Sequence, residues 1–184
     1  MGKSLRLNVR SATVADIPAM LDLERQCPTA AHWSQQQYED LFLAHEDGPR
    51  RLVLVLEESA DVADGAGATA ASRLESSASS RTLGFLIANQ IGPDWELENI
   101  VVAPASRRKG LATRLFTALL TRARETNSEQ VFLEVRESNQ TARGFYLRLG
   151  FEESGRRKLY YANPPEDAVL YCLALNSALT TAPT

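Results

Sequence analysis

The chain contains few of the residues from which metal sites and disulfides are built. Its 184 residues include 2 cysteines and 2 histidines, and neither Cys27 nor Cys172 belongs to a C-x-x-C pair. This is a poor supply for a metal site, so we expect none, and we interpret both thiols as reduced and structural. No apolar run approaches the roughly 20 residues of a membrane span, and the first ten residues lack the apolar core of a signal peptide. We therefore expect a cytoplasmic protein without a membrane partner.

An excess of charge of either sign is also lacking. The net charge is −3, with 44% hydrophobic and 23% charged residues, which is ordinary for a globular protein. A chain with this charge is not built to coat nucleic acid, so we expect no nucleic-acid partner. The length fits one domain with a core of its own. Local clusters of cations stand out against this slightly acidic background.

The hydrophobic pattern predicts a mixed α/β fold. Alternating or continuous apolar runs predict strands over 5–9, 51–57, 82–90, 95–104, 131–135, 151–161 and 168–175. Stripes of helical period predict helices over 16–26, 34–47, 110–125 and 139–149. This order predicts a single domain over 1–178, followed by a tail over 179–184. Its core is one central, mixed and mostly antiparallel sheet flanked by about four helices.

Residues at the ends of these helices support their boundaries. Asp16 is able to cap the first helix, and Ser34 stands three residues before Gln37, which is the spacing of a capping box. Gly150 has the position of a C′ glycine that ends the last helix. In the strand over 82–90, Gly84 is a candidate for a bulge or a close backbone approach.

The segment 57–82 has a different composition from the rest of the chain. It consists mostly of Ala, Ser, Gly and acidic residues, and Leu74 is the single large apolar residue between Val62 and Leu83. Such a segment cannot bury enough apolar surface to offset the entropy lost on ordering. We expect a long, mobile loop that joins two strands of one domain.

The stretch "SRRKGLAT", residues 106–113, places three cations and a glycine where a helix begins. The first turn of a helix leaves backbone N–H groups unpaired and carries partial positive charge, so it suits a phosphate group. Gly110 lets the backbone approach a ligand closely, and Arg107, Arg108 and Lys109 add charge-assisted contacts. Taken alone, the motif favours the alternative of a solvated cluster of cations on an exposed turn, because short motifs often match by chance.

Longer stretches resemble a known family. "WELENIVVAPASRRKGLATRLF" resembles the acetyl-CoA-binding motif of the GNAT N-acetyltransferases, a strand followed by [QR]-x-x-G-x-[GA] and a helix. "LEVRESNQTARGFYLRLGFEESGRRKLYY" resembles the ribosomal-protein-alanine N-acetyltransferase (RimI-like) branch of that family. The resemblance covers roughly residues 5–175, with 57–82 as an insertion.

The resemblance implies acetyl-CoA as the cofactor. Its pyrophosphate is expected on the start of the helix, and its pantetheine arm is expected to pair like an extra strand with the preceding strand. Asn139 matches a family asparagine that contacts the cofactor, and it is equally placed to cap the helix that follows. The cofactor-binding residues implied are Ile100, Val101, Val102, Arg107, Arg108, Lys109, Gly110, Leu111, Ala112, Thr113, Asn139 and Tyr146.

The resemblance also implies catalytic residues. Glu134 matches the general base of the RimI-like branch, and Tyr146 matches its general acid. From the residues alone, Glu134 reads as an outward-facing strand carboxylate and Tyr146 as a core aromatic on an apolar stripe. Glu96 is the second candidate for the base, because many other GNAT enzymes use a glutamate at this place. Strand alternation puts Glu96 and Glu98 on one face.

Acceptor recognition is expected in the region of Tyr160 and Tyr161, which match a tyrosine pair that grips peptide backbone in family members acting on protein N-termini. The residues alone allow two aromatics at a strand end. Three hypotheses follow. The first is acetyl transfer to the N-terminal α-amine of a protein, with a ribosomal protein as partner. The second is transfer to a small amine or a lysine side chain, with Glu96 as base. The third is a non-catalytic module that binds acyl-CoA.

Overall fold

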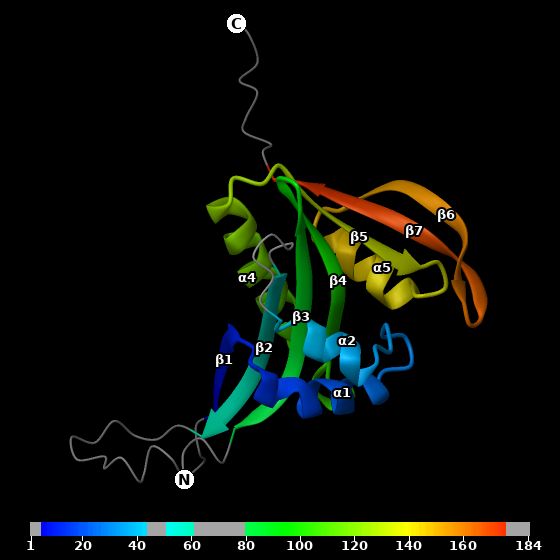
Figure 1. Cartoon of the computed structure of the whole chain (residues 1–184). Helices are drawn as coiled ribbons and strands as arrows, with labels where there is room; N and C mark the ends of the chain where they lie inside the picture. Colours follow the sequence, from blue (N-terminus) through cyan, green and yellow to red (C-terminus); the bar gives the residue numbers. More distant parts are fainter. Residues whose placement is uncertain (1–4, 44–50, 61–79, 176–184) are drawn as a thin grey trace, which may run out of the picture. The chain divides into compact units, whose positions relative to one another are not determined.

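The computed structural model describes residues 5–43, 51–60 and 80–175 (Figure 1). The strands are β1 (Leu5–Ser11), β2 (Arg51–Ala60), β3 (Arg81–Ile91), β4 (Asp94–Val102), β5 (Gln130–Arg136), β6 (Glu152–Ala162) and β7 (Pro165–Ala174). The α-helices in these ranges are α1 (Ile17–Arg25), α2 (Gln35–Asp40), α4 (Leu111–Glu125) and α5 (Gln140–Arg148). Two short 3₁₀ turns, η1 (Val14–Asp16) and η2 (Pro104–Ser106), precede α1 and α4.

The strands form one seven-stranded sheet in the order β1-β2-β3-β4-β5-β7-β6. β1 pairs with β2, β5 with β7 and β6 with β7 in antiparallel fashion, whereas β4 and β5 are parallel. The expected single domain with a mixed, mostly antiparallel sheet and about four helices is therefore confirmed. The parallel pair arises because α4 connects β4 to β5, and a parallel pair needs such a crossover.

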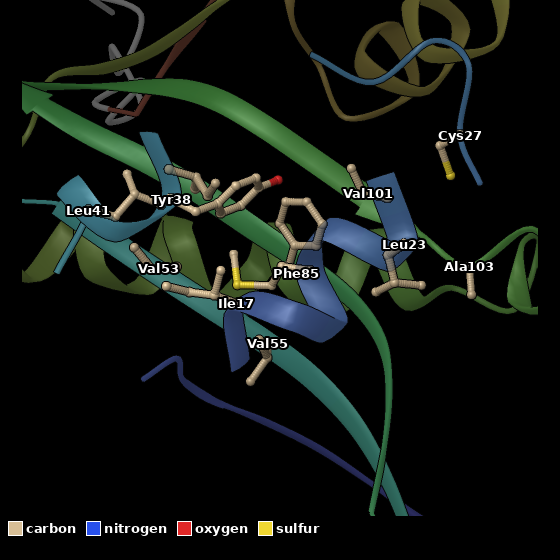
Figure 2. Packing of buried hydrophobic residues seen from close by; sticks show 12 residues of the cluster. Ile17, Leu23, Cys27, Tyr38, Leu41, Val53, Val55, Phe85, Val101 and Ala103 are labelled. Atoms are coloured by element: carbon tan, nitrogen blue, oxygen red, sulfur yellow. The ribbon is translucent and has the colours of Figure 1, made fainter. Parts of the chain in front are cut away.

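Within this fold, the contacts gather in two compact units, which share β3, β4 and α4. The first unit contains the described residues of 5–43, 52–60, 80–87 and 99–118, and the second contains residue 51 and those of 88–98 and 119–175. In the first unit, α1 and α2 lie across β2 and β3 (Figure 1). Figure 2 shows their buried side chains meeting those of the strands. The core there consists of Ile17, Met20, Leu23, Cys27, Tyr38, Leu41, Val53, Val55, Phe85, Ile87, Val101 and Ala103.

The second unit has a core of its own, built on strand alternation. Trp95 and Leu97 of β4 are buried while Glu96 between them is partly exposed, which is the pattern of a strand with one covered face. The indole Nε1 of Trp95 donates to the hydroxyl of Thr126 at 3.0 Å. α5 contributes Tyr146, whose ring packs against Phe151. β6 and β7 form a long, curved hairpin beside it (Figure 1).

The expected helix ends are confirmed at two places and corrected at one. The Ser34 hydroxyl accepts from the backbone N–H of Gln37, whose side chain accepts from the N–H of Ser34, so the capping box is formed. Gly150 has φ +91° beyond α5, as a C′ glycine requires. Asp16 occupies the N-cap position of α1 but its side chain does not cap that helix. Its carboxylate instead binds Arg10 at 2.8 Å.

Several element boundaries also differ from those expected. α2 ends at Asp40, so it is shorter than the predicted 34–47. Strand β2 continues to Ala60 and β3 begins at Arg81, so both ends of the predicted loop 57–82 are strand. Residues 57–60 pair with β1 in spite of their polar composition, because Asn8, Leu7, Arg6 and Leu5 offer them a ladder. The rest of that loop, 61–79, and the predicted tail 179–184 lie outside the described residues.

Candidate active site

The turn before α4 belongs to the first unit and contains two residues with positive φ. Arg108 has φ +62° and Gly110 has φ +75°, so the backbone makes two left-handed steps before α4 begins at Leu111. Gly110 suits this conformation because it has no Cβ. No heavy atom lies within 4 Å of the place where a Cβ of Gly110 would stand. The first N–H groups of α4 therefore emerge from an open, cation-rich turn.

The three cations of this turn differ in their contacts and in their exposure. The guanidinium of Arg107 is turned toward Cys27, with Nη2 at 3.1 Å from Sγ and Nε at 3.4 Å from the carbonyl oxygen of Val102. Arg108 and Lys109 are exposed, and neither makes an ion pair with another described residue. Two cations thus remain available to a ligand, while Arg107 ties the turn to the ends of α1 and β4.

The expected pantetheine strand, Ile100–Val102, lies on a stretch of β4 without a β5 partner among the described residues. The parallel ladder runs from Trp95 opposite Val131 to Leu97 opposite Leu133 and stops there. β4 nevertheless continues to Val102 as a strand. A strand edge without a neighbouring strand is the feature that an extended ligand needs for strand-like pairing. Within this stretch, the carbonyl oxygen of Val102 already accepts from Nε of Arg107.

Asn139 stands at the N-cap of α5. Its side-chain oxygen Oδ1 accepts from the backbone N–H of Ala142 at 3.1 Å. The capping alternative for this residue is therefore realised. A contact of its side-chain nitrogen with a cofactor is compatible with this bond, because the cap uses the oxygen alone.

In the second unit, Glu96 and Glu134 project from the same face of the sheet. Glu96 lies opposite Phe132 in the parallel ladder, and Glu134 is two residues farther along β5. Burial, followed by the negative charge of Glu134, raises the pKa of Glu96, and Arg157 and Arg51 oppose this rise. Among the described residues, the Glu96 side chain makes no hydrogen bond or ion pair. It is thus the carboxylate of this face with raised proton affinity and no direct partner.

Glu134, in contrast, is held by two residues of β6. Nη1 of Arg157 lies 3.1 Å from its Oε1, and the Glu134 side chain is 13% exposed. The hydroxyl of Tyr160 donates a hydrogen bond to the same carboxylate, which raises the pKa of Tyr160. The neighbouring carboxylate, Glu98, is bound by Arg51 at 3.1 Å. Burial raises the pKa of Glu98, and Arg51 counteracts it.

An irregularity in the hairpin brings Arg157 and Tyr160 to the same carboxylate. Arg157 lies opposite Ala168 and Tyr161 opposite Glu166, so β6 advances four residues where β7 advances two. In this bulge Leu159 has φ +51°. Plain strand alternation would place Arg157 and Tyr160 on opposite faces, and the extra residues of the bulge remove that restriction.

Tyr146 is a buried aromatic residue of α5, with 6% of its surface exposed. Its ring centroid lies 5.4 Å from that of Phe145, 5.5 Å from Phe151 and 6.4 Å from Tyr171. Burial raises the pKa of Tyr146, and the nearby Tyr161 adds to the rise. The packing role considered from the sequence is therefore realised. Its hydroxyl is also a weaker acid than an ordinary tyrosine.

The tyrosine pair of β6 consists of two unlike residues. Their rings meet edge to face with centroids 5.2 Å apart. Tyr160 is 49% exposed, whereas Tyr161 is partly buried under the guanidinium of Arg136, whose Cζ lies 4.1 Å from the ring centroid. Burial, with a smaller contribution from Glu134, raises the pKa of Tyr161 to about 12. The guanidinium of Arg157 lies over the ring of Tyr160 as well, with Cζ 5.4 Å from its centroid. Tyr160 is thus the more exposed member of the pair, but its ring also has a cationic neighbour.

The sequence did not reveal some polar residues that organise these two regions. Arg157 was hidden because it reaches Glu134 across β7, through a strand order and register that the sequence does not show. In the first unit, Glu24 is 2% exposed, and its carboxylate accepts from the backbone N–H of Trp33 and from Nδ2 of Asn99, each at 2.9 Å. A glutamate in this amphipathic helix was a possible signal of a buried polar contact. The sequence did not indicate its partner Asn99, which is 75 residues away in the chain.

The described ranges contain neither a cluster of three or more metal-binding side chains nor a helix long and apolar enough to cross a membrane. The expected catalytic and acceptor residues Glu96, Glu134, Tyr146, Tyr160 and Tyr161 all lie in the second unit. The helix start and the stretch Ile100–Val102, which are expected to bind the cofactor, lie in the first. Asn139 belongs to the second unit.

Comparison with known proteins identifies relatives of this chain. Residues 17–151 match the acetyltransferase (GNAT) family. A ribosomal protein bS18-alanine N-acetyltransferase of Escherichia coli (strain K12) is 26% identical over 170 residues, which are 91% of this chain and 97% of that protein. One from Haemophilus ducreyi is 34% identical over 96 residues, 50% of this chain. The matches to the Haemophilus ducreyi protein and to a Bacillus subtilis relative span 66% and 55% of those proteins.

A solved structure shares the fold. The crystal structure of the ribosomal-protein-S18-alanine N-acetyltransferase from Escherichia coli superimposes with a TM-score of 0.69 at 24% identity. The superposition covers 97% of this chain and 100% of that one. At this identity the likeness concerns the fold, and the residues of the site have to be argued from this chain itself.

Proposed function

Because the chain belongs to the GNAT acetyltransferase family, we propose that it transfers an acetyl group from acetyl-CoA to the N-terminal α-amine of a protein. We propose as acceptor a ribosomal protein that begins with alanine after removal of methionine. The observation that carries the proposal is the group of Glu96, Glu134 and Tyr160 on one face of the sheet. Such a group is able to receive a cationic amine and take its proton.

The cofactor is assigned to the features of the first unit. The open N-terminus of α4, at Leu111, Ala112 and Thr113, is suited to the pyrophosphate, because unpaired N–H groups and the helix dipole favour an anion there. Arg108 and Lys109 lie free beside it. The edge of Ile100–Val102, which has no β5 partner among the described residues, is suited to the amides of the pantetheine arm. The carbonyl oxygen of Val102 would have to release Nε of Arg107 to take part. When bound, acetyl-CoA supplies the thioester that the amine attacks.

The reaction needs a proton acceptor and no enzyme nucleophile. A free α-amine has a pKa of ~7.7–8.0, so roughly a tenth of it is already neutral at pH 7. An ordinary glutamate with a pKa of ~4.3 is about 3.5 units too weak a base, a deficit of roughly 5 kcal/mol. We propose Glu134 as the carboxylate that receives the ammonium proton, directly or through water. The raised pKa of Glu96 lessens this deficit, which makes Glu96 the alternative base.

Tyr146 is proposed as the acid that protonates the leaving thiolate. A thiolate resembling that of cysteine has a conjugate acid of pKa ~8.5, so an ordinary tyrosine with a pKa near 10 would give up its proton at a cost of roughly 2 kcal/mol. Burial raises the pKa of Tyr146, and hence this cost. Tyr146 therefore acts first as a hydrogen-bond donor to the developing charge and transfers its proton as the carbon–sulfur bond breaks.

A second candidate function is acetylation of a small amine or of a lysine side chain with Glu96 as base. The raised proton affinity of Glu96 favours it, since a lysine amine with a pKa of ~10.4 is neutral in well under a thousandth of molecules at pH 7 and needs a stronger base. The two functions therefore differ in how strongly they depend on Glu96.

The test is acetyl transfer, followed by mass spectrometry, to three kinds of acceptor. These are a peptide that begins with alanine, the same peptide with a blocked N-terminus and internal lysines, and a panel of polyamines and aminoglycosides. Modification of the free N-terminus alone is the expected result. Tyr160→Phe, which removes the hydroxyl bound to Glu134, should weaken transfer. Efficient transfer to lysine or to a small amine, with the free peptide inert, would replace the first candidate by the second.

A further inference from the structure

The carboxylate of Glu134 and the guanidinium of Arg157 form an ion pair in which the glutamate is largely buried and the arginine is exposed. Glu134 is on β5, between β4 and β7 in the sheet, whereas Arg157 is on the edge strand β6. The Glu134 side chain is 13% exposed and that of Arg157 is 56% exposed. The guanidinium of Arg157 also lies over the ring of Tyr160, with Cζ 5.4 Å from the ring centroid. An exposed arginine on an edge strand is able to leave both partners without disturbing the core.

The register of the sheet explains how Arg157 reaches a residue two strands away. Glu134 lies opposite Leu170 of β7, and Leu170 lies opposite Gly155 of β6. Gly155 has no side chain, and no heavy atom lies within 4 Å of its possible Cβ. The place beside Glu134 on this face is therefore left open on β6. Arg157, two residues farther along on the same face, reaches Oε1 of Glu134 with its Nη1 at 3.1 Å.

If Arg157 is left out of the count, the carboxylates of Glu96 and Glu134 give this face an excess of negative charge. Glu96 and Glu134 repel one another, and Arg51, which also acts on Glu96, is occupied by Glu98 at 3.1 Å. Tyr160 and Tyr161 are neutral, because the environment raises the pKa of both. The charged or titratable groups that face the two carboxylates from β4, β6 and the start of β2 are Arg51, Glu98, Arg157, Tyr160 and Tyr161. On β5 itself, Arg136 is two residues beyond Glu134, and it is paired with Glu166 of β7 at 3.3 Å.

We propose that Arg157 is a counter-cation that the acceptor displaces, so that the protonated amine takes the place of the guanidinium beside Glu134. The inference rests on the proposed function, since it concerns the same acceptor. Arginine suits the role because it stays protonated and cannot itself be acetylated in place of the substrate amine. Exchange of one cation for another keeps the charge of the face constant. The site is thereby selective for a cationic amine. Arg157 holds the carboxylate of Glu134 until this amine binds, and it competes with the amine for that carboxylate.

The first test is a titration of the full-length protein without substrate. The carboxyl carbon of Glu96 is followed by NMR in the wild type and in the Arg157→Gln, Arg157→Lys and Arg156→Gln variants. The positive charge of Arg157 lowers the pKa of Glu96. We therefore expect Arg157→Gln to raise the Glu96 midpoint and Arg157→Lys to leave it near that of the wild type.

Arg156→Gln is the matched control, because it removes the neighbouring arginine of the same strand. Arg156 binds Glu137 and Glu153 and makes no contact with Glu134. Its removal should leave the Glu96 midpoint in place. A Glu96 midpoint that is the same in Arg157→Gln and in the wild type would overturn the counter-cation role, whether or not any acceptor is acetylated.

The second test observes the displacement itself. The side-chain nitrogen resonance of Arg157 is recorded while a peptide that begins with alanine, or its N-acetylated form, is added. We expect the free-amine peptide to shift this resonance and the acetylated one to leave it unchanged, and the acceptor KM to fall several-fold in Arg157→Gln. A peptide that binds without moving Arg157, or a KM that rises, would contradict displacement. A peptide that fails to bind would count against the proposed function, while the titration still decides the role of Arg157.

Discussion

Gly84 of β3 lies directly against the carbonyl oxygen of Val101 in β4. A Cβ built on Gly84 would stand 2.7 Å from that oxygen, closer than such contacts occur. The expectation of a close backbone approach at Gly84 is therefore confirmed. The contact matters for function because Val101 belongs to the stretch of β4 proposed to pair with the cofactor.

The first prediction concerns this contact. Gly84→Ala should lower the free energy of unfolding by about 1–3 kcal/mol, since the backbone has to shift to admit the methyl group. Urea denaturation gives the measurement. Gly155→Ala is the control, because nothing lies within 4 Å of its Cβ position, and it should change stability by less than about 0.5 kcal/mol. Equal effects of the two substitutions would contradict the prediction.

The second prediction concerns acetyl-CoA and the turn before α4. Gly110→Glu should abolish binding in calorimetry, because it places a negative charge and bulk where the pyrophosphate is expected. Wild-type affinity should fall at high salt, since phosphate contacts to Arg108 and Lys109 are screened. Gly92→Glu is a matched control, since Gly92 also has a positive φ, +61°, and open space at its Cβ position. It should retain binding, and a similar loss there would indicate a general effect of charge or strain.

The third prediction concerns the proposed acid. Tyr146→Phe should lower kcat by about 10²-fold or more while leaving the KM for acetyl-CoA and the thermal stability nearly unchanged, because Phe keeps the packing of the ring. Tyr171→Phe is the control from the same aromatic group, in which the lost hydroxyl accepts from Nε of Arg143 at 3.2 Å. It should keep kcat within a few-fold. An unchanged kcat in Tyr146→Phe would reduce Tyr146 to a packing residue.

The fourth prediction is a pH dependence of stability with a definite sign. The pKa of Glu96 is raised on folding, chiefly by burial and then by Glu134. Above the ordinary value of 4.5 the unfolded chain ionises this group more easily, so Glu96 destabilises the folded state at neutral pH. Glu96→Gln should therefore raise Tm at pH 7. The gain should disappear as the pH falls through the raised pKa toward 4.5.

Asp16 supplies the opposite case. Its hydrogen bonds with Arg10 lower its pKa below the ordinary 3.8, against the effect of burial. A lowered pKa contributes stability above 3.8 that is lost as the pH falls through the folded value. Asp16→Asn should therefore lower Tm at pH 7, and the difference should shrink below pH 3.8. Thermal melts across pH measure both variants, and a pH-independent difference in either would contradict its assignment.

The sequence by itself determined the features that depend on short-range physical chemistry. The period of apolar residues located the seven strands and four α-helices found within 5–43, 51–60 and 80–175. The Ser34–Gln37 spacing located a capping box that the structure contains. The composition of "SRRKGLAT" indicated an exposed, cation-rich turn, and Gly110 has the positive φ that such a turn uses. These features are readable because each depends on neighbours within a few residues.

Tertiary structure decided the environment of the candidate catalytic groups. Glu96 and Glu134 are adjacent only because β4 and β5 pair in parallel in one register. Arg157 and Tyr160 reach Glu134 together only because β6 carries a bulge that breaks alternation. The charge, the burial and hence the proton affinity of a carboxylate depend on groups that are distant in the chain, and a one-residue change of register would turn those groups to the other face of the sheet.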